Sequence, residues 1–516
     1  MHTSRSGPPP EERHVSLFNP ARSSARPLTP AVPVDRIVAQ ARTLDERLAA
    51  ARSPWLSGSS ESDELDVERR LHEWRHAAAA GEDDQFAKRL AWDGLTLGQA
   101  RAALDDRLLP STGHRPAWAD ILQDALDDRD VTVRQTGASG SMPFEEVLEP
   151  FVRVAGRRVM AGAGTAWKRL SESARGALAE GLSNTLCSYA AQTLQLEFTV
   201  WRSTRQSGLD RLASNLSGRT DRRLYTAFTT ALREGGLADL LAEYAVLARL
   251  LSVVTELWIE ATLEFVGRLD ADWPTLQEVF GSHEPLGRVI DLRPSLSDPH
   301  RGRRSVIALT FASGARVVYK PKDLGVDAAY DRLLAWLAAR GAPIEFGRPA
   351  LLVRDGYGWV EFVAHSPHQD SAETHRYYRN SGGVLCVLHL LGATDCHFEN
   401  IIAAGEYPVP VDLETLLHHH TAERRRSGTE AEWKAEDDLA RSVLATSMLP
   451  VWQIGDNGAS VYDVSGLGGL TEQETQFQSA VWSQVNTDQM TMRFERAVFH
   501  PSSNLPVLSG PAAGPA

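Results

Sequence analysis

Five polar residues with the chemistry of phosphoryl transfer lie close together in the second half of the chain. Asp395, His397 and Asn400 occur in the string TDCHFEN, and Asp412 and Glu414 follow in the string VDLET. A carboxylate can accept the proton of an attacking hydroxyl, and an asparagine and a second carboxylate can hold Mg²⁺ against ATP phosphates. This order predicts Asp395 as the general base. Asn400 and Asp412 are then the expected metal ligands, and Glu414 either joins them or only lines the site.

Each of these residues also has an ordinary structural interpretation. Asp395 could cap a turn, and asparagine at a position such as Asn400 is common in turns. His397 could contact phosphate, or it could brace the loop by hydrogen bonds. These alternatives stay open for each residue taken alone.

A lysine upstream of the cluster lies where a phosphate-binding lysine is expected. The strings SVIALTF and RVVYK are rich in strand-forming residues and flank a Gly-containing turn, so residues 305–320 predict a β-hairpin. Lys320 ends the second strand, from which its ammonium could reach ATP phosphates as a point charge. A solvated lysine at a strand end is the usual alternative, but the downstream cluster favours the nucleotide site.

The elements that must position these residues change in character along the chain. Residues 1–33 are rich in Pro, Ser and Arg and predict a disordered leader, whereas residues 34–285 have mostly helical periodicity. From residue 286 short strands dominate, and ALLVRDGYGWVEFV predicts two strands joined by an Asp-Gly turn. Residues 327–340 and 377–392 predict helices on either side of it. The fold class expected is therefore α+β, with a helical N-terminal region before a sheet-containing region.

Several strings make this second half similar to the dehydratase region of class II lanthipeptide synthetases, the LanM type. They cover roughly Asp298 to Met490 and read SDPHRGRRSVIALTF, VVYKPKDL, DGYGWVEFV, YYRNSGGVLCVLHLLGATDCHFENIIAAGEYPVPVDLETL, SVLATSMLP and NTDQM. Members of that family have a core that resembles lipid kinases. They phosphorylate Ser and Thr of a precursor peptide with ATP and then eliminate phosphate to give dehydroalanine and dehydrobutyrine. A separate C-terminal zinc domain adds cysteine thiols.

The resemblance implies a bilobal, lipid-kinase-like core with ATP and Mg²⁺ as cofactors and a precursor peptide with its leader as partner. Residues 34–285 would be the helical part of the dehydratase, residues 286–370 the N-lobe and residues 371–516 an incomplete C-lobe. Asp298 and His300 match an Asp-x-His of the family, which implies that they act on the phosphorylated intermediate in the elimination step. A solvated charged loop is the alternative for this pair.

The chain also departs from the family pattern. Lys322 and Asp323 stand where the family has Arg and Ser after the strand lysine. The family's elimination step uses an Arg and a Thr beyond the D-x-E strand, and Arg441 and Thr446 are the nearest candidates. The expectation is a dehydratase region truncated before its end and without the cyclase domain. It would be a fragment, a split enzyme completed by a second chain, or a decayed copy.

Composition excludes several other classes of protein. The 516 residues carry a formal net charge of −13, which disfavours binding to nucleic acid or anionic membranes. Three cysteines cannot form a disulfide framework, and no zinc set is expected because no cysteine lies at ligand spacing from the histidines at 418–420. The most apolar helical stretch, residues 237–269, carries charges and predicts no membrane span. We expect a cytoplasmic protein, with residues 418–436 as a polar loop.

Three functions remain on these grounds. The first is the kinase step of a lanthipeptide dehydratase. The second is a catalytically incomplete pseudokinase or peptide-binding scaffold. The third is a small-molecule or lipid phosphotransferase, because the core motif alone does not select the acceptor.

Overall fold

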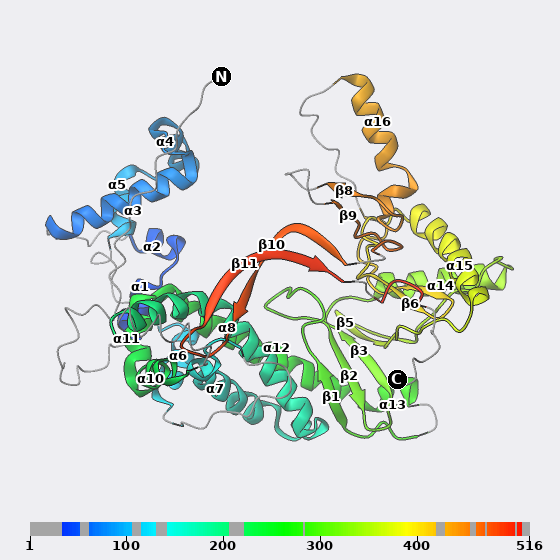
Figure 1. Ribbon diagram of the computed structural model, residues 1–516, viewed down its shortest axis with the longest axis horizontal. Coiled ribbons are helices and arrows are strands. Elements are labelled where there is room, and N and C mark those ends of the chain that lie inside the picture. Colours follow the sequence, from blue (N-terminus) through cyan, green and yellow to red (C-terminus); the bar gives the residue numbers. More distant parts are fainter. Residues whose placement is uncertain are drawn as a thin grey trace. The chain divides into compact units, whose positions relative to one another are not determined.

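A computed structural model of the chain gives the placement of its elements (Figure 1). The described residues are 34–51, 61–105, 115–128, 130, 142–205, 221–281, 284–418, 429–454, 461–469, 472–500 and 503–507. The predicted leader, residues 1–33, lies outside them, as do His419 and His420. The chain divides into two compact units, each described below by itself.

The first unit comprises Met1–Gly164, Ala179–Glu264 and Gln484–Thr491, and its described elements are helices. They are α1 (Val34–Gln40), α2 (Leu44–Ala51), α3 (Glu61–Ala79), α4 (Asp83–Trp92), α5 (Leu97–Leu104), α6 (Ala117–Asp127), α7 (Glu145–Ala163), α10 (Arg223–Ala231), η4 (Leu232–Gly236) and α11 (Leu237–Glu243), with most of α8 (Glu172–Ser203) and α12 (Ala245–Ala271). The predicted helical N-terminal region is confirmed.

Aromatic side chains from distant parts of the sequence form the core of this helical unit. The ring centroid of Phe144 lies 5.6 Å from that of Tyr225 and 6.2 Å from that of Phe198. Phe198 in turn lies 5.3 Å from Phe228. All four side chains are fully buried. Their tilted and edge-on packing is the arrangement that aromatic rings prefer, and it fixes α8 against α10.

The string NTDQM has a structural role in this unit. Asn486 accepts hydrogen bonds from the backbone N–H of Phe144 at 3.0 Å and from the hydroxyl of Tyr225 at 2.8 Å. Asp488 Oδ1 accepts a hydrogen bond from the backbone N–H of Tyr225 at 2.7 Å, in the first turn of α10. The carboxylate therefore caps a helix from which it is remote in sequence, because the first-turn N–H groups have no partner within the helix.

Replacing Asp488 with Ala should lower the free energy of unfolding by about 1–2 kcal/mol, because a buried helix N-terminus loses its acceptor. Asp239→Ala, at an exposed position of α11, is the matched control and should change stability by less than about 0.5 kcal/mol. Urea unfolding followed by circular dichroism measures both variants. Faster hydrogen exchange confined to α10 would locate the effect, and equal stability of the two variants would contradict the capping role.

The second unit comprises Thr165–Leu178, Phe265–Ser483 and Met492–Ala516 and contains the main sheet. Its five strands are β1 (Val289–Arg293), β2 (Ile307–Phe311), β3 (Arg316–Lys320), β4 (Leu351–Arg354) and β5 (Tyr357–Glu361), which are antiparallel in the order β1-β2-β3-β5-β4. Both predicted hairpins are confirmed. Gly356, with φ of +73°, supplies the left-handed conformation that the turn of the second hairpin needs.

Two helices and a small hairpin complete the surroundings of the site. Helix α14 (Gly325–Ala339) follows β3, and α15 (Ser371–Leu390) begins earlier than predicted because the Asp370 side chain accepts the N–H of Glu373 and caps it. Strands β6 (Ile401–Ala404) and β7 (Tyr407–Pro410) pair antiparallel. One apolar cluster joins these elements, and its members include Tyr330, Leu334, Val384, Leu388, Ile401 and Leu413.

The remaining elements of this unit flank the sheet and the site in sequence. They are α13 (Trp273–Phe280) and η3 (Gly164–Arg169) before the sheet, and α16 (Glu430–Ala440), η5 (Val443–Thr446), β8 (Gln453–Ile454), β9 (Val461–Tyr462), β10 (Gln473–Ser483) and β11 (Thr491–Phe499) after the site. Much of the expected polar loop at 418–436 lies outside the described residues, but its end is helical in α16. That part of the prediction was wrong. The two units together confirm the α+β fold class.

Candidate active site

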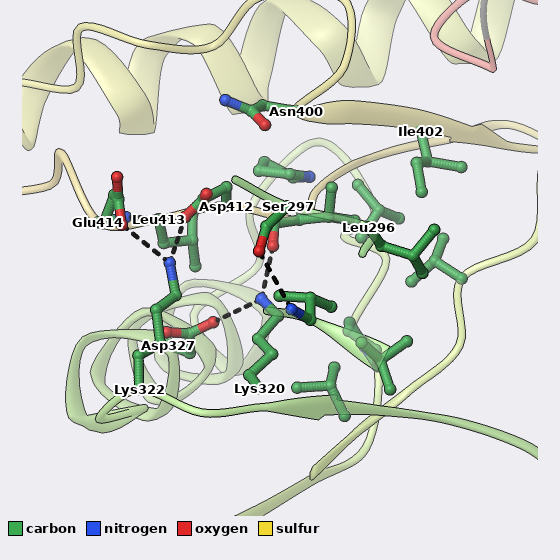
Figure 2. A pocket seen from close by; sticks show the side chains of 18 of the residues that line it. Leu296, Ser297, Lys320, Lys322, Asp327, Asn400, Ile402, Asp412, Leu413 and Glu414 are labelled. Carbon is green, nitrogen blue, oxygen red and sulfur yellow. Dashed lines mark hydrogen bonds and ion pairs between the residues drawn. The ribbon is translucent and has the colours of Figure 1, made fainter. Parts of the chain in front are cut away.

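A cavity of about 1050 Å³ in the second unit gathers the residues that the sequence singled out. All eight predicted site residues line it: Asp298, His300, Lys320, Asp395, His397, Asn400, Asp412 and Glu414. They come from the loop before β2, the end of β3, the loop before β6 and the segment after β7. Figure 2 shows the lysine side of the cavity facing the segment that carries Asp412 and Glu414. The structure therefore brings these residues together, and their roles stay predictions.

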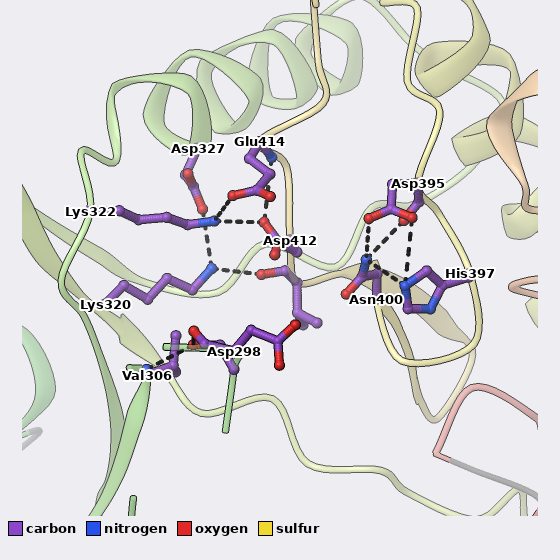
Figure 3. A network of polar contacts seen from close by, with 12 residues as sticks. Asp298, Val306, Lys320, Lys322, Asp327, Asp395, His397, Asn400, Asp412 and Glu414 are labelled. Carbon is purple, nitrogen blue, oxygen red and sulfur yellow. Dashed lines mark hydrogen bonds and ion pairs between the residues drawn. The ribbon is translucent and has the colours of Figure 1, made fainter. Parts of the chain in front are cut away.

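Lys320 is held at the cavity wall by two oxygen atoms. Lys320 is the last residue of β3 and is only 7% exposed. Its ammonium donates a hydrogen bond to the carbonyl of Val411 at 2.6 Å. It also pairs with Asp327 Oδ1 at 3.3 Å, from the first turn of α14 (Figure 3). A buried ammonium needs such partners because desolvation penalises an unpaired charge. Lys320 is thus not the solvated strand-end lysine of the alternative interpretation.

Asp327 is a candidate functional residue that the sequence analysis missed. Its only local signal is its place in the first turn of a helix that directly follows the lysine strand. In protein kinases the strand lysine likewise pairs with an acid of the next helix. The separation in sequence does not by itself reveal that α14 turns this carboxylate towards the lysine.

Asp327→Asn should lower the rate of phosphoryl transfer roughly tenfold to a hundredfold, because Lys320 loses the anion that orients its ammonium. The KM for ATP should also rise in Asp327→Asn. Asp438→Asn is the control, because Asp438 is an exposed acid that pairs with Lys434 on α16, and its KM for ATP should rise less. Steady-state kinetics of both variants at several ATP concentrations provide the measurement. Unchanged ATP kinetics in Asp327→Asn, with a native circular dichroism spectrum, would contradict the pairing role.

The two carboxylates after β7 are bound to one ammonium. Lys322 Nζ donates to Asp412 Oδ1 at 2.7 Å and to Glu414 Oε2 at 3.1 Å (Figure 3). Burial by itself lowers the pKa of Lys322, but the bonds to Asp412 and Glu414 outweigh burial, so the pKa lies above its ordinary value. Asp412 and Glu414 therefore point to a common position, where they already hold a positive charge.

The predicted base lies on a braced loop. Asn400 Nδ2 donates to the backbone carbonyl of Asp395 at 2.8 Å, which leaves the amide oxygen of Asn400 as its possible metal ligand. His397 Nε2 lies 3.6 Å from Asp395 Oδ1, and its Nδ1 accepts the N–H of Glu399 at 3.2 Å. These contacts favour the bracing interpretation of His397, and a phosphate contact stays a prediction. The N–H of Val411 donates to the carbonyl of Asn400 at 2.9 Å, which connects this loop to the segment that carries Asp412 and Glu414.

Two further backbone bonds hold this loop from the other side. The N–H of Cys396 donates to the carbonyl of Thr446 at 2.9 Å, and that of Phe398 donates to Val464 at 3.0 Å. A Cβ at Gly466 would lie 2.4 Å from the carbonyl oxygen of Cys396, so only glycine permits this approach. Thr446, Val464 and Gly466 thus fix the conformation of the loop that presents Asp395.

Asp298 and His300 lie beside a tight basic turn. The backbones of His300 and Arg304 exchange hydrogen bonds at 2.9 and 2.8 Å. Arg301 and Arg303 between them have φ angles of +40° and +64°, and the left-handed region is unfavourable for residues with a Cβ. Such conformations concentrate at functional sites, where surrounding contacts enforce them. Asp298, His300 and Arg301 all line the cavity.

Arg441 and Thr446, the candidates for the second half of the chemistry, lie elsewhere in the second unit. Arg441 pairs with Asp437 at 3.1 Å on an exposed surface. Thr446 is 1% exposed, and its hydroxyl donates to the carbonyl of Val443 at 2.7 Å. Neither residue lines the cavity. Thr446 contacts the loop of Asp395 through its backbone carbonyl, which accepts the N–H of Cys396 at 2.9 Å, but neither Arg441 nor Thr446 joins the other candidate residues in the cavity.

The oxygen-bearing side chains of the cavity fit a Mg²⁺ ion that also binds substrate phosphates better than they fit a metal ion bound only by protein side chains. Within the described ranges, no group of three or more His, Cys, Asp and Glu side chains is placed to hold a metal ion. Mg²⁺ is usually bound through one or two carboxylates and the phosphates of its substrate. The carboxylates of Asp412 and Glu414 bind a single ammonium, so this pair can hold one cation.

None of the helices that the structure describes is long and apolar enough to cross a membrane.

Comparisons with known proteins cover the part of the chain that contains this cavity. Residues 244–516, more than half of the chain, match the family described as "Domain of unknown function (DUF4135)". The chain is also similar to the Lacticin 481/lactococcin biosynthesis protein LcnDR2 of Lactococcus lactis subsp. lactis, with 33% identity over 186 residues. That alignment covers 34% of this chain and 20% of the relative. The match thus spans about a fifth of the length of the Lactococcus protein.

Proposed function

The chain belongs to the DUF4135 family, and we propose that it transfers the γ-phosphoryl group of ATP to Ser and Thr hydroxyls of a precursor peptide, as the first step of lanthipeptide dehydration. The observation that carries this proposal is one cavity lined by a strand lysine, a loop aspartate and asparagine, and two further carboxylates. Similarity to a protein named for lacticin biosynthesis supports a role in peptide modification. We further propose that the reaction takes place in the cytoplasm.

Lys320 would bind the ATP phosphates. Its ammonium is held by Asp327 and the Val411 carbonyl, so its position is fixed before a nucleotide enters. A lysine acts on phosphate as a point charge, and a preorganised charge costs little reorganisation during the reaction. The pairing of a strand lysine with a helix acid supports a kinase-type site.

Asp412 and Asn400 would hold Mg²⁺, with Glu414 as a third ligand or as a charge beside the metal. A Mg²⁺ ion held by these residues would supply positive charge against the phosphate oxygens. The backbone bond from Val411 to Asn400 keeps the two ligand segments in register. The candidate ligands are all oxygen atoms, and Mg²⁺ is usually bound by one or two carboxylates together with the phosphates of its substrate. The site therefore suits Mg²⁺ bound together with ATP.

Asp395 would act as the general base. The peptide hydroxyl oxygen attacks the γ-phosphorus, the bond from phosphorus to ADP breaks, and the hydroxyl proton passes to the Asp395 carboxylate. His397 Nε2 lies 3.6 Å from that carboxylate, and Asn400 Nδ2 donates to the backbone carbonyl of Asp395 at 2.8 Å and to its Oδ2 at 3.4 Å, so both residues would position the base. Asp298 and His300 would then assist removal of the Cα proton and departure of phosphate, which leaves the dehydro residue.

A scaffold without catalysis is the second candidate, and one observation favours it. Lys322 binds the two carboxylates that the kinase reaction assigns to a metal. If that ammonium stayed in place, the site could not load Mg²⁺ and the chain would bind peptide only. The experiments on Lys322 below distinguish this candidate from the enzyme.

The acceptor is tested by offering three substrates with radiolabelled ATP and Mg²⁺. A Ser/Thr-rich peptide should become labelled, whereas the same peptide with Ala at every Ser and Thr, and vesicles of phosphatidylinositol, should not. Labelled lipid with unlabelled peptide would instead support a lipid phosphotransferase. No labelled product in any sample would support the scaffold.

A further inference from the structure

Two lysines that lie close in sequence have separate partners in the cavity. Lys320 has its own acid, Asp327, and the Val411 carbonyl. Lys322 pairs with Asp412 and Glu414, and within the described residues no other acidic side chain forms an ion pair with it. Figures 2 and 3 show the two ammonium groups reaching different parts of the same segment. Lys322 therefore has a different role from Lys320, the lysine proposed to bind the ATP phosphates.

The Lys322 ammonium lies between two carboxylates, at a position that attracts a cation. Two carboxylates that point to a common position repel each other unless a positive charge lies between them. The lysine ammonium is a compact charge with three donors, and two of its contacts here are with those carboxylates. The ammonium thus neutralises the pair in the same way that a divalent cation would.

We propose that Lys322 is a built-in competitor of the divalent cation at Asp412 and Glu414. This inference rests on the proposed function, because it concerns the same metal site. The ammonium holds the two carboxylates in the metal-free chain, and it must leave Asp412 before that oxygen can bind a metal. Loading then exchanges one ion pair for another, so the chain binds a free metal ion weakly. Lys322 is a positioning residue in this account, because it acts through the metal ligands.

Direct metal binding tests the competition without any turnover. Mn²⁺ alone is titrated into the full chain, without nucleotide, and free Mn²⁺ is measured by electron paramagnetic resonance. Lys322→Met keeps the length of the side chain and removes its charge. Lys434→Met removes the same charge from an exposed ion pair on α16 and is the matched control. We expect Lys322→Met to bind Mn²⁺ roughly tenfold or more tightly than the parent, and Lys434→Met to match the parent.

Thermal unfolding gives a second readout that also reports folding. Without metal, Lys322→Met should unfold at a lower temperature than the parent, because two carboxylates face each other without a counter-charge. Mn²⁺ at one high concentration should raise its unfolding temperature by more than it raises that of the parent, since at a fixed ligand concentration a tighter-binding ligand stabilises the folded state more. Lys322→Gln serves as a second uncharged variant and should behave in the same way.

The outcomes separate this inference from the proposed function. Equal or weaker Mn²⁺ binding by both Lys322 variants, with binding in the parent still dependent on Asp412, would overturn the competition and leave the proposed metal site intact. Absence of Mn²⁺ binding in the parent and in both variants, each with a native circular dichroism spectrum, would overturn the metal site and the competition together.

Discussion

Asp412→Asn is expected to lower phosphoryl transfer by about a thousandfold or more while leaving the fold intact. The substitution keeps the size of the side chain but removes the negative charge that would neutralise the metal, and a metal at a phosphoryl oxygen contributes several kcal/mol to the transition state. Lys322 keeps its second partner, Glu414, at 3.1 Å, so the loop after β7 retains an ion pair. The rate is measured as phosphate incorporated into a Ser/Thr-rich peptide at saturating ATP.

Asp437→Asn is the control for this prediction. Asp437 lies on α16 and pairs with Arg441 on an exposed surface, so the same chemical change occurs away from the cavity. Its turnover should match that of the parent. The metal assignment fails if Asp412→Asn keeps full turnover at saturating Mg²⁺ and retains a native circular dichroism spectrum.

Asp395→Asn should reduce kcat by about a hundredfold to ten-thousandfold, the usual contribution of a general base. The KM for ATP should change little, because the loss concerns proton transfer from the acceptor hydroxyl and not the binding of phosphates. Asn400 Nδ2 bonds mainly to the backbone carbonyl of residue 395 at 2.8 Å, so the loop should keep its conformation. Kinetics with varied ATP and with varied peptide separate the two effects.

Glu399→Gln provides the matched control on the same loop. Glu399 is an exposed carboxylate close to Asp395 in sequence, so a general loss of negative charge at the loop would affect both variants. We expect Glu399→Gln to retain most of the activity. If both substitutions lower kcat equally, Asp395 is not the base. If Asp395→Asn lowers only the affinity for ATP, its role lies in nucleotide binding.

Local rules made much of the site predictable from the sequence. Strand-forming strings around Gly-containing turns identified the hairpins β2–β3 and β4–β5, and with them the strand end at Lys320. The order of Asp395, Asn400 and Asp412 identified a cluster that lines one cavity in the structure. These signals depend on neighbouring residues, so they can be read without the fold.

Contacts between distant residues could not be predicted in the same way. The bond of Lys322 to Asp412 depends on how the segment after β7 lies against the end of β3, which no local pattern specifies. Capping of α10 by Asp488 joins residues far apart in sequence. The start of α16 is a different case, because Thr429 and Glu432 form a capping box, a local pattern that is visible in the sequence.

The mass of a peptide after a single turnover tests the central claim most directly. The full chain, in excess over a Ser/Thr-rich peptide with its leader, is mixed with ATP and Mg²⁺, and samples are quenched at short intervals for mass spectrometry. The account predicts a species about 80 Da heavier per modified site that requires ATP and forms at least about a hundredfold more slowly in Asp395→Asn. Its conversion to a species about 18 Da lighter than the starting peptide would add the elimination step. A peptide of unchanged mass at every time, with ATP intact and the chain folded, would contradict the account.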